Sequence, residues 1–190
     1  EILIGLVGSE MCIRDRYVVH LDEIENNGET CRCDILPEIY YEADDMVYIY
    51  YTSGTTGKPK MIAGKSESLL HFIEWEIKEF GIDESYRFSQ LTRPTFDPYL
   101  RDIFVPLLSG GTICIPAEDE IYLNSMKLVK WLESEEINLI HTVPSLFRII
   151  QEQKLTEESF KNLKYILLAG EKLYPSYLEH WYGIFSDRIQ

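Results

Sequence analysis

The chain has 190 residues, of which 45% are hydrophobic and 13% aromatic, a composition that supports one folded domain and excludes a chain disordered throughout. Its 18 Lys and Arg against 32 Asp and Glu give a formal net charge of −14, which repels nucleic acids and anionic membrane surfaces. From the charge we expect no nucleic-acid partner. Because no run of about 18 apolar residues occurs, we expect no membrane-spanning segment and a cytoplasmic location.

Residues 1–16 are expected to lie outside the native fold. The chain begins with Glu1 rather than Met, which indicates a piece of a longer polypeptide. The segment 10–16, EMCIRDR, can be back-translated into a sequence that resembles a transposase end tag used in preparing sequencing libraries. We interpret residues 1–16 as a non-native artefact, the alternative being an edge strand followed by a basic turn. Residues 17–190 are then one partial domain, truncated at both ends.

From Tyr17 onward, strand patterns alternate with helix patterns. Runs of β-branched and aromatic residues predict strands, and apolar residues at helical spacing predict helices. Asp97-Pro98 supplies a cap and a first residue for one helix, which Gly110-Gly111 ends. This alternation predicts an α/β fold with a parallel sheet covered by helices on both faces. The predicted strands are 46–51 (read as buried), 86–91, 112–115, 138–141 and 163–168, and the predicted helices are 66–80, 98–108, 121–135, 144–153 and 175–185.

The segment 51–60, YTSGTTGKPK, carries the strongest functional signal. It directly follows a predicted strand, its glycines allow a ligand to approach the backbone, and its four hydroxyl side chains can donate to oxyanions. Residues 52–65 contain three lysines and no carboxylate, although the whole chain is strongly acidic. The spacing Gly54-x-x-Gly57-Lys58-Pro59 differs from the nucleoside-triphosphatase P-loop. We therefore predict a polyphosphate site of another kind.

Other candidates are weaker. Cys31-x-Cys33 could ligate a metal, but a structural zinc site needs four ligands and no second pair follows, so no metal site is assigned to these residues. His141 ends a predicted strand, where ligand-binding residues lie in parallel sheets, and packing in the core is the alternative.

The segment 51–60 closely resembles the phosphate loop of the adenylate-forming (AMP-binding) superfamily, which includes acyl-CoA synthetases, luciferases and nonribosomal peptide synthetase adenylation domains. Residues 44–190 follow the order of that family, with similar segments at 110–112 (GGT), 143–145 (VPS) and 168–173 (LAGEKL). Phe96-Asp97 selects the adenylation domains, because a carboxylate in the pocket matches the ammonium of an α-amino acid. The implied fold is part of the N-terminal subdomain of an adenylate-forming enzyme.

The resemblance implies ATP-dependent activation of an amino acid as aminoacyl-AMP, with Mg²⁺ as metal cofactor. The acyl group would then pass to a phosphopantetheine on a carrier domain, and carrier and condensation domains would lie in the parent protein. The implied adenine side holds Gly170 and Glu171, and the implied substrate pocket holds Asp97, Arg101, His141, Leu167 and Ala169. The implied phosphate-binding residues are Thr52, Ser53, Gly54, Thr55, Thr56, Gly57, Lys58 and Lys60.

Two departures from the family pattern qualify this interpretation. Met61 stands where the family loop most often has glycine. The family's ribose-binding aspartate and its C-terminal lysine are not found in this sequence, so we expect the chain alone to be inactive. The alternatives are a carboxylic acid ligase of the acyl-CoA synthetase type and a non-catalytic nucleotide-binding scaffold.

Overall fold

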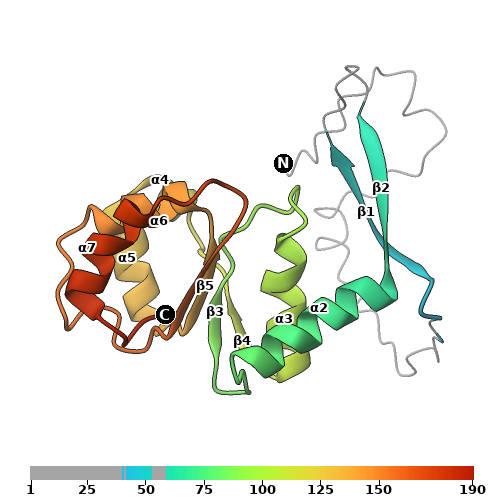
Figure 1. Cartoon of the computed structure of the whole chain (residues 1–190), viewed down its shortest axis with the longest axis horizontal. Helices are drawn as coiled ribbons and strands as arrows, with labels where there is room; N and C mark the ends of the chain where they lie inside the picture. Colours follow the sequence, from blue (N-terminus) through green and yellow to red (C-terminus); the bar gives the residue numbers. More distant parts are fainter. Residues whose placement is uncertain (1–39, 41, 53–58) are drawn as a thin grey trace, which may run out of the picture. The chain divides into compact units, whose positions relative to one another are not determined.

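The protein is described here from a computed structural model, which covers residues 40, 42–52 and 59–190 (Figure 1). The chain divides into two units, residues 1–42 and 43–190, and the described helices and strands all belong to the second. None of its helices combines the length and the apolar character needed to cross a membrane. In chain order its elements are β1 (Met46–Thr52), β2 (Lys60–Lys65), α2 (Ser66–Glu79), β3 (Arg87–Ser89), α3 (Tyr99–Ser109), β4 (Thr112–Cys114), α4 (Asp119–Leu123), α5 (Ser125–Ser134), β5 (Leu139–Thr142), α6 (Pro144–Gln151), β6 (Tyr165–Leu168) and α7 (Pro175–Phe185).

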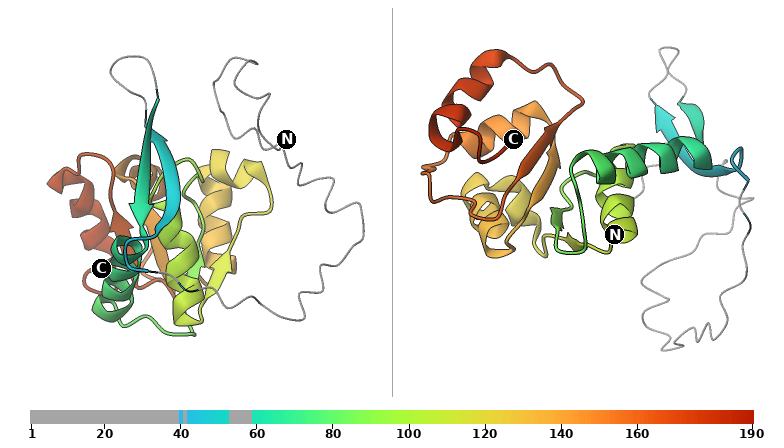
Figure 2. Two further views of the ribbon diagram at one scale, coloured as in Figure 1. Left: turned by 90° about the vertical axis from the view of Figure 1, so that its right-hand side faces the viewer. Right: turned by 60° about the horizontal axis from the view of Figure 1, so that its bottom comes forward.

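Four strands form a parallel sheet in the order β4-β3-β5-β6, which confirms the predicted α/β fold. Helices α5, α6 and α7 cover one face, and α2 and α3 cover the other (Figures 1 and 2). Neighbouring residues of β5 point to opposite faces, as alternation in a strand requires. Ile140 joins the core beneath α5 to α7, and Leu139 joins the core that contains Ile73 of α2 and Val105 of α3.

Residues 46–51 form a strand, but the expectation that it is a buried strand of the parallel sheet is wrong. The strand β1 pairs antiparallel with β2, which the sequence pattern did not reveal. Seven residues separate Thr52 from Lys60, and so short a connection joins antiparallel strands, whereas parallel strands need a longer crossover. The apolar side chains of this hairpin are largely exposed, with Met46 at 60% and Ile49 at 54%.

The expected helix 121–135 is two helices, α4 and α5, divided at Asn124. The Asn124 side chain accepts hydrogen bonds from the backbone amides of Met126 at 3.0 Å and Lys127 at 3.1 Å. An asparagine that satisfies the first free amides of a helix favours a new N-terminus over a continuous helix. The division therefore follows from local capping chemistry.

Proline and glycine set other helix ends close to their predicted places. Pro144 and Pro175 begin α6 and α7, where the missing proline amide has no partner to lose. Gly110 ends α3 at φ 77°, a left-handed conformation that favours glycine. The helix α3 begins at Tyr99, one residue later than expected, with Pro98 at its N-cap.

Candidate active site

Of the predicted pocket residues, His141 and Leu167 belong to strands β5 and β6, and Arg101 belongs to helix α3. Asp97 and Ala169 lie on the loops that follow β3 and β6, at the carboxyl edge of the sheet. In parallel α/β sheets ligands bind at this edge. The loops after β5 and β6 are joined by a hydrogen bond from the Ala169 amide to the Thr142 carbonyl at 3.1 Å. The strand order thus places Asp97 and Ala169, which lie 72 positions apart in the sequence, at the same edge of the sheet.

Only the two ends of the predicted phosphate loop belong to the described part of the structure. Thr52 and Lys60 face each other as paired residues at the end of the β1-β2 hairpin where residues 53–59 connect the two strands. Ser53, Gly54, Thr55, Thr56, Gly57 and Lys58 lie outside the described residues. Lys60 is exposed and forms no ion pair with any residue that the structure describes, so its ammonium is available to an anionic ligand.

Asp97 is exposed in the turn that leads into α3. Its carbonyl accepts a hydrogen bond from the Leu100 amide at 3.0 Å, so the backbone is already curving into the helix. Burial raises the pKa of the Tyr50 phenol, and the negative charge of Asp97 raises it further. The Asp97 carboxylate therefore lies near Tyr50 of the β1-β2 hairpin, whose two strands are connected by the predicted phosphate loop.

Arg101 and Leu167 line one groove, of about 440 Å³, between α2, α3, β6 and α7. The Arg101 guanidinium lies 5.7 Å from the centre of the Phe72 ring. Its Nε atom is buried and has no hydrogen-bond partner among the described residues. The groove is mainly apolar, so an unpaired donor at its wall favours a ligand that brings a hydrogen-bond acceptor.

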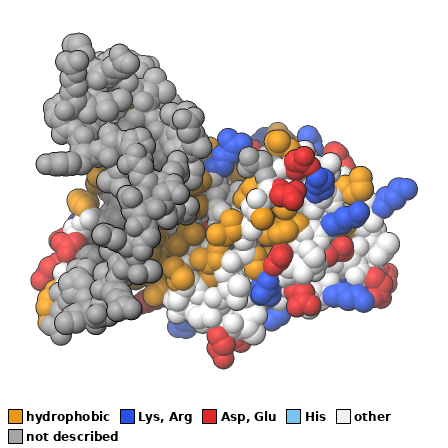
Figure 3. Space-filling view, turned by 180° about the vertical axis from the view of Figure 1, so that it is seen from behind, with side chains coloured by type: hydrophobic (Ala, Val, Ile, Leu, Met, Phe, Trp, Pro, Cys, Tyr) orange, Lys and Arg blue, Asp and Glu red, His pale blue; other side chains and the backbone are white. Residues whose placement is uncertain are grey.

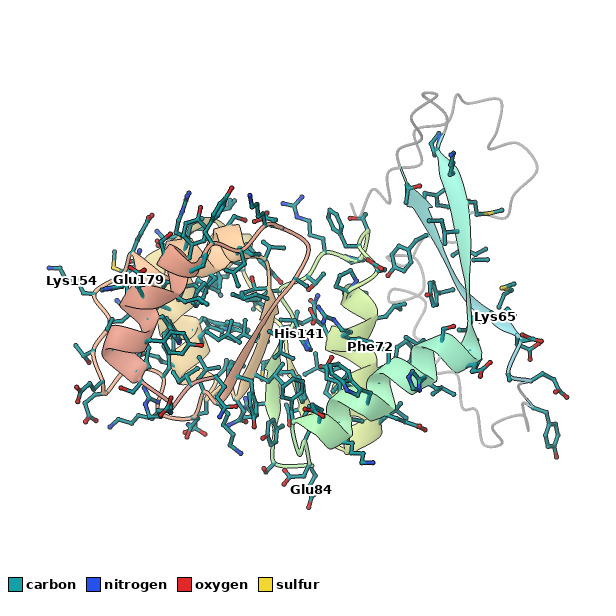
Figure 4. The ribbon with its side chains drawn as sticks, in the orientation of Figure 1. Lys65, Phe72, Glu84, His141, Lys154 and Glu179 are labelled. Atoms are coloured by element: carbon teal, nitrogen blue, oxygen red, sulfur yellow. The ribbon has the colours of Figure 1, made fainter. Side chains whose placement is uncertain are left out.

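His141 occupies the centre of a buried group of three ionisable side chains. Its Nδ1 lies 2.8 Å from Oδ1 of Asp102 on α3, and its Nε2 lies 2.6 Å from Oε1 of Glu76 on α2. All three side chains are at most 1% exposed. Figure 4 shows His141 between the sheet and helices α2 and α3.

The two carboxylates shift the protonation equilibrium of His141. Burial lowers the pKa of His141, but the hydrogen bonds to Asp102 and Glu76 more than offset it, so the pKa lies above its usual value. The carboxylates contact opposite ring nitrogens and do not converge on one point.

Within the described residues, no cluster of His, Cys, Asp and Glu has the arrangement to hold a metal ion, and Cys31 and Cys33 lie outside them.

Gly170 and Glu171 form the turn after β6. Gly170 has φ 85°, which an L side chain rarely adopts. The Glu171 carboxylate accepts hydrogen bonds from the backbone amide and the hydroxyl of Ser145, each at 2.9 Å. Glu171 thereby binds the N-terminus of α6, where free amides favour negative charge.

The structure brings only some of the predicted pocket residues together. Arg101 and Leu167 share the groove, Asp97 and Ala169 are exposed at the carboxyl edge, and His141 is enclosed in the core. The buried carboxylates of Glu76 and Asp102 were not expected from the sequence. Each is a charged residue on the apolar face of its helix, three residues from Ile73 and Val105 respectively, and that pattern could have identified them.

Charged side chains of both signs are interspersed on the surface. On the face shown in Figure 3, Lys and Arg lie among Asp and Glu, and the described residues form no continuous basic surface there.

Sequence and structure comparisons place this chain in a known family. The family model for AMP-binding enzymes matches residues 9–190. Gramicidin S synthase 2 from Brevibacillus brevis is 35% identical over 132 residues, which cover 70% of this chain and 3% of that protein. The chain thus spans a small part of this relative.

Two solved structures share the fold. One is NpsA-ThdA from Klebsiella oxytoca, an artificially fused adenylation-PCP di-domain of a nonribosomal peptide synthetase, with a TM-score of 0.67 at 21% identity. The match covers 78% of this chain and 28% of the NpsA-ThdA chain. The Vibrio cholerae adenylation domain AlmE, solved with glycyl-adenosine-5′-phosphate, has a TM-score of 0.66 at 29% identity, covering 74% of this chain and 26% of its own. The chain therefore belongs to the family of AMP-binding enzymes and corresponds to the N-terminal region of a nonribosomal peptide synthetase adenylation domain.

Proposed function

We propose that the complete domain containing this chain uses ATP and Mg²⁺ to activate an α-amino acid as aminoacyl-AMP. The observation that supports this proposal is the position of Asp97. Its carboxylate is exposed at the carboxyl edge of the sheet, about one helical turn before Arg101. An α-ammonium group that leaves water needs a counter-charge, and a carboxylate supplies a charge-assisted hydrogen bond. The glycyl-adenosine-5′-phosphate in the related AlmE structure supports an amino acid as the activated acid.

The proposed pocket assigns separate tasks to the residues around Asp97. Asp97 binds the α-ammonium, while Arg101 and Leu167 contact the substrate side chain from the groove, which leaves the substrate carboxylate free to face the phosphates. Ala169 completes the lining through its small side chain, whereas His141 lies behind the pocket wall. The unpaired Nε of Arg101 favours an amino acid with a polar or acidic side chain.

The reaction is an in-line attack of the amino-acid carboxylate on the α-phosphorus of ATP, with pyrophosphate leaving. Catalysis of such a step consists mainly of alignment and charge neutralisation. Residues 52–58 and Lys60 bind the departing pyrophosphate, and Gly170 and Glu171 lie on the adenine side. The exposed ammonium of Lys60 suits a polyphosphate, and bound Mg²⁺ supplies further neutralisation of phosphate charge.

We further propose that the acyl group passes to the thiol of a phosphopantetheine on a carrier domain. The NpsA-ThdA structure, an adenylation domain fused to a PCP, supports a carrier as partner. Carrier and condensation domains in the parent protein are the partners expected for such a transfer.

The test is amino-acid-dependent exchange of pyrophosphate into ATP by the complete adenylation domain. Asp97→Ala is expected to lower kcat/KM at least about 30-fold for every α-amino acid accepted, because the ammonium loses its counter-charge. The des-amino acid, which has no ammonium to match, should lose much less. Glu84→Gln, which changes an exposed carboxylate preceding β3, is the control and should leave the rate unchanged.

Two outcomes would favour the alternative functions. Equal losses for the amino acid and its des-amino analogue would remove the role of Asp97 and favour a carboxylic acid ligase that uses coenzyme A. ATP binding without exchange for any acid would favour a non-catalytic nucleotide-binding scaffold.

A further inference from the structure

A buried chain of hydrogen bonds connects the sheet to the segment that carries Asp97. It begins at Glu76 on α2, continues through His141 on β5, and reaches Asp102 on α3. Oδ2 of Asp102 then accepts a hydrogen bond from the backbone amide of Thr92 at 3.2 Å. Thr92 lies in the loop between β3 and α3, five residues before Asp97. Helix α2, strand β5, helix α3 and the loop that precedes α3 are thus joined by one set of hydrogen bonds.

The geometry favours a charged imidazole. A neutral imidazole has one donor nitrogen and one acceptor nitrogen, whereas an imidazolium donates from both. Both ring nitrogens of His141 face carboxylate oxygens, so a neutral ring would direct its lone pair at one of them. With water excluded, that arrangement is costly, while an imidazolium satisfies both sides. Glu76 and Asp102 are therefore bound to one shared positive charge.

Asp102 is well placed to control its helical neighbour, Arg101. Successive residues of a helix are separated by a fixed rotation of about 100°. Fixing the Asp102 side chain against β5 therefore sets the rotation of α3 and the direction in which Arg101 projects into the groove. The hydrogen bond to Thr92 fixes the loop before the helix at the same time.

We propose that His141 is a positioning residue: as an imidazolium between Asp102 and Glu76, it fixes the loop 92–98 and the rotation of α3, and so places Asp97 and Arg101 for the substrate. This role rests on the proposed function of the two residues that it positions. His141 has no free ring nitrogen to offer a ligand and is 1% exposed, so its effect on the substrate is exerted through Asp102.

The two carboxylates provide a matched pair of variants. Asp102→Asn and Glu76→Gln each replace a buried carboxylate that contacts the same imidazole. Only Asp102 also accepts from the Thr92 amide, so only Asp102→Asn weakens the connection to the loop. If the network only stabilises the fold, both variants should change hydrogen exchange at the Thr92 amide to a similar extent. If it positions the loop, Asp102→Asn should change this exchange more than Glu76→Gln does. Ser89→Ala is the control, because Ser89 is buried on β3 and its hydroxyl has no partner among the described residues.

The first measurement is amide hydrogen exchange on the 190-residue chain. In Asp102→Asn, the Thr92 amide should exchange at least about tenfold faster than in the wild type, because a carboxylate with an oxygen for each of two donors is replaced by a neutral amide with a single acceptor oxygen. Glu76→Gln and Ser89→Ala should change it less than about threefold, which is under 1 kcal/mol. Amides of α5, which lie outside the network, report general destabilisation. Equal exchange at Thr92 in Asp102→Asn and Glu76→Gln, after correction by α5, would overturn the proposal.

The second measurement uses the complete adenylation domain. Asp102→Asn should raise KM for the amino acid about tenfold, while KM for ATP stays within about twofold, since only the substrate pocket is displaced. A parallel rise in both KM values would contradict the positioning role. If the wild-type domain shows no amino-acid-dependent exchange, the proposed function fails, and hydrogen exchange at Thr92 alone decides whether the network fixes the loop.

Discussion

Nδ1 of His141 lies 2.8 Å from Oδ1 of Asp102, so that a buried charged hydrogen bond joins strand β5 to helix α3. The two residues are 39 positions apart in the sequence, and Glu76 completes the group from a third element, α2. Burying a charge is favourable only when partners replace water, and each member of this group depends on the others. The stability of this interface between helices and sheet should therefore depend on the protonation of His141.

The unfolding free energy should show this dependence on pH. The folded pKa of His141 lies above its unfolded value of about 6.5, so its stabilising contribution is complete below about pH 6.5 and is lost as the pH rises through the folded pKa. The charged groups facing the ring are Glu76 and Asp102. Urea unfolding of the wild type and His141→Gln from pH 6 to 10 measures the effect. The difference in unfolding free energy between the wild type and His141→Gln should be largest near pH 6. A difference that does not change with pH would contradict a charged His141.

Asn124→Ala should destabilise the fold by about 0.5–2 kcal/mol, because it removes the cap that accepts from Met126 and Lys127. Lys130→Ala, an exposed change on the same helix, should stay within about 0.5 kcal/mol. Chemical denaturation of both variants gives the comparison. Similar unfolding free energies for the two would mean that α4 and α5 are divided for another reason than capping.

Glu171→Ala should lower stability by about 0.5–2 kcal/mol, since the amide of Ser145 at the start of α6 loses its acceptor. Glu171→Gln keeps an acceptor oxygen and should recover part of the loss. In the complete domain, the position of Glu171 on the proposed adenine side predicts that Glu171→Ala also raises KM for ATP. An unchanged KM for ATP with reduced stability would restrict Glu171 to its capping role.

Lys58→Ala and Thr56→Ala should weaken ATP use by the complete domain. Hydrogen bonds to charged groups contribute about 1.5–3 kcal/mol, which corresponds to roughly 10- to 150-fold in kcat/KM for ATP. KM for the amino acid should change little, because the substrate pocket is formed by other segments. Steady-state pyrophosphate exchange distinguishes the two substrates, and unchanged kinetics in both variants would show that the loop does not bind phosphate.

Much of the fold could be predicted because its signals are local. Apolar periodicity and the terminal residues Pro144, Pro175 and Gly110 set the helix ends within a few residues, since each acts through its own backbone geometry. Asn124 was the exception, because a cap within a long helical pattern divided one expected helix into two. Strand β1 also departed from expectation, since a run of apolar residues does not reveal whether its partner is parallel or antiparallel.

The sequence by itself determined the α/β class and the family resemblance, and it predicted candidate phosphate-loop and pocket residues, because these depend on residue order and spacing. The tertiary structure decided which of those residues meet. It placed Arg101 and Leu167 in one groove, and it enclosed His141 between Glu76 and Asp102. No sequence spacing indicates that three ionisable side chains share one buried point, since that contact exists only once α2 and α3 pack on β5 and exclude water.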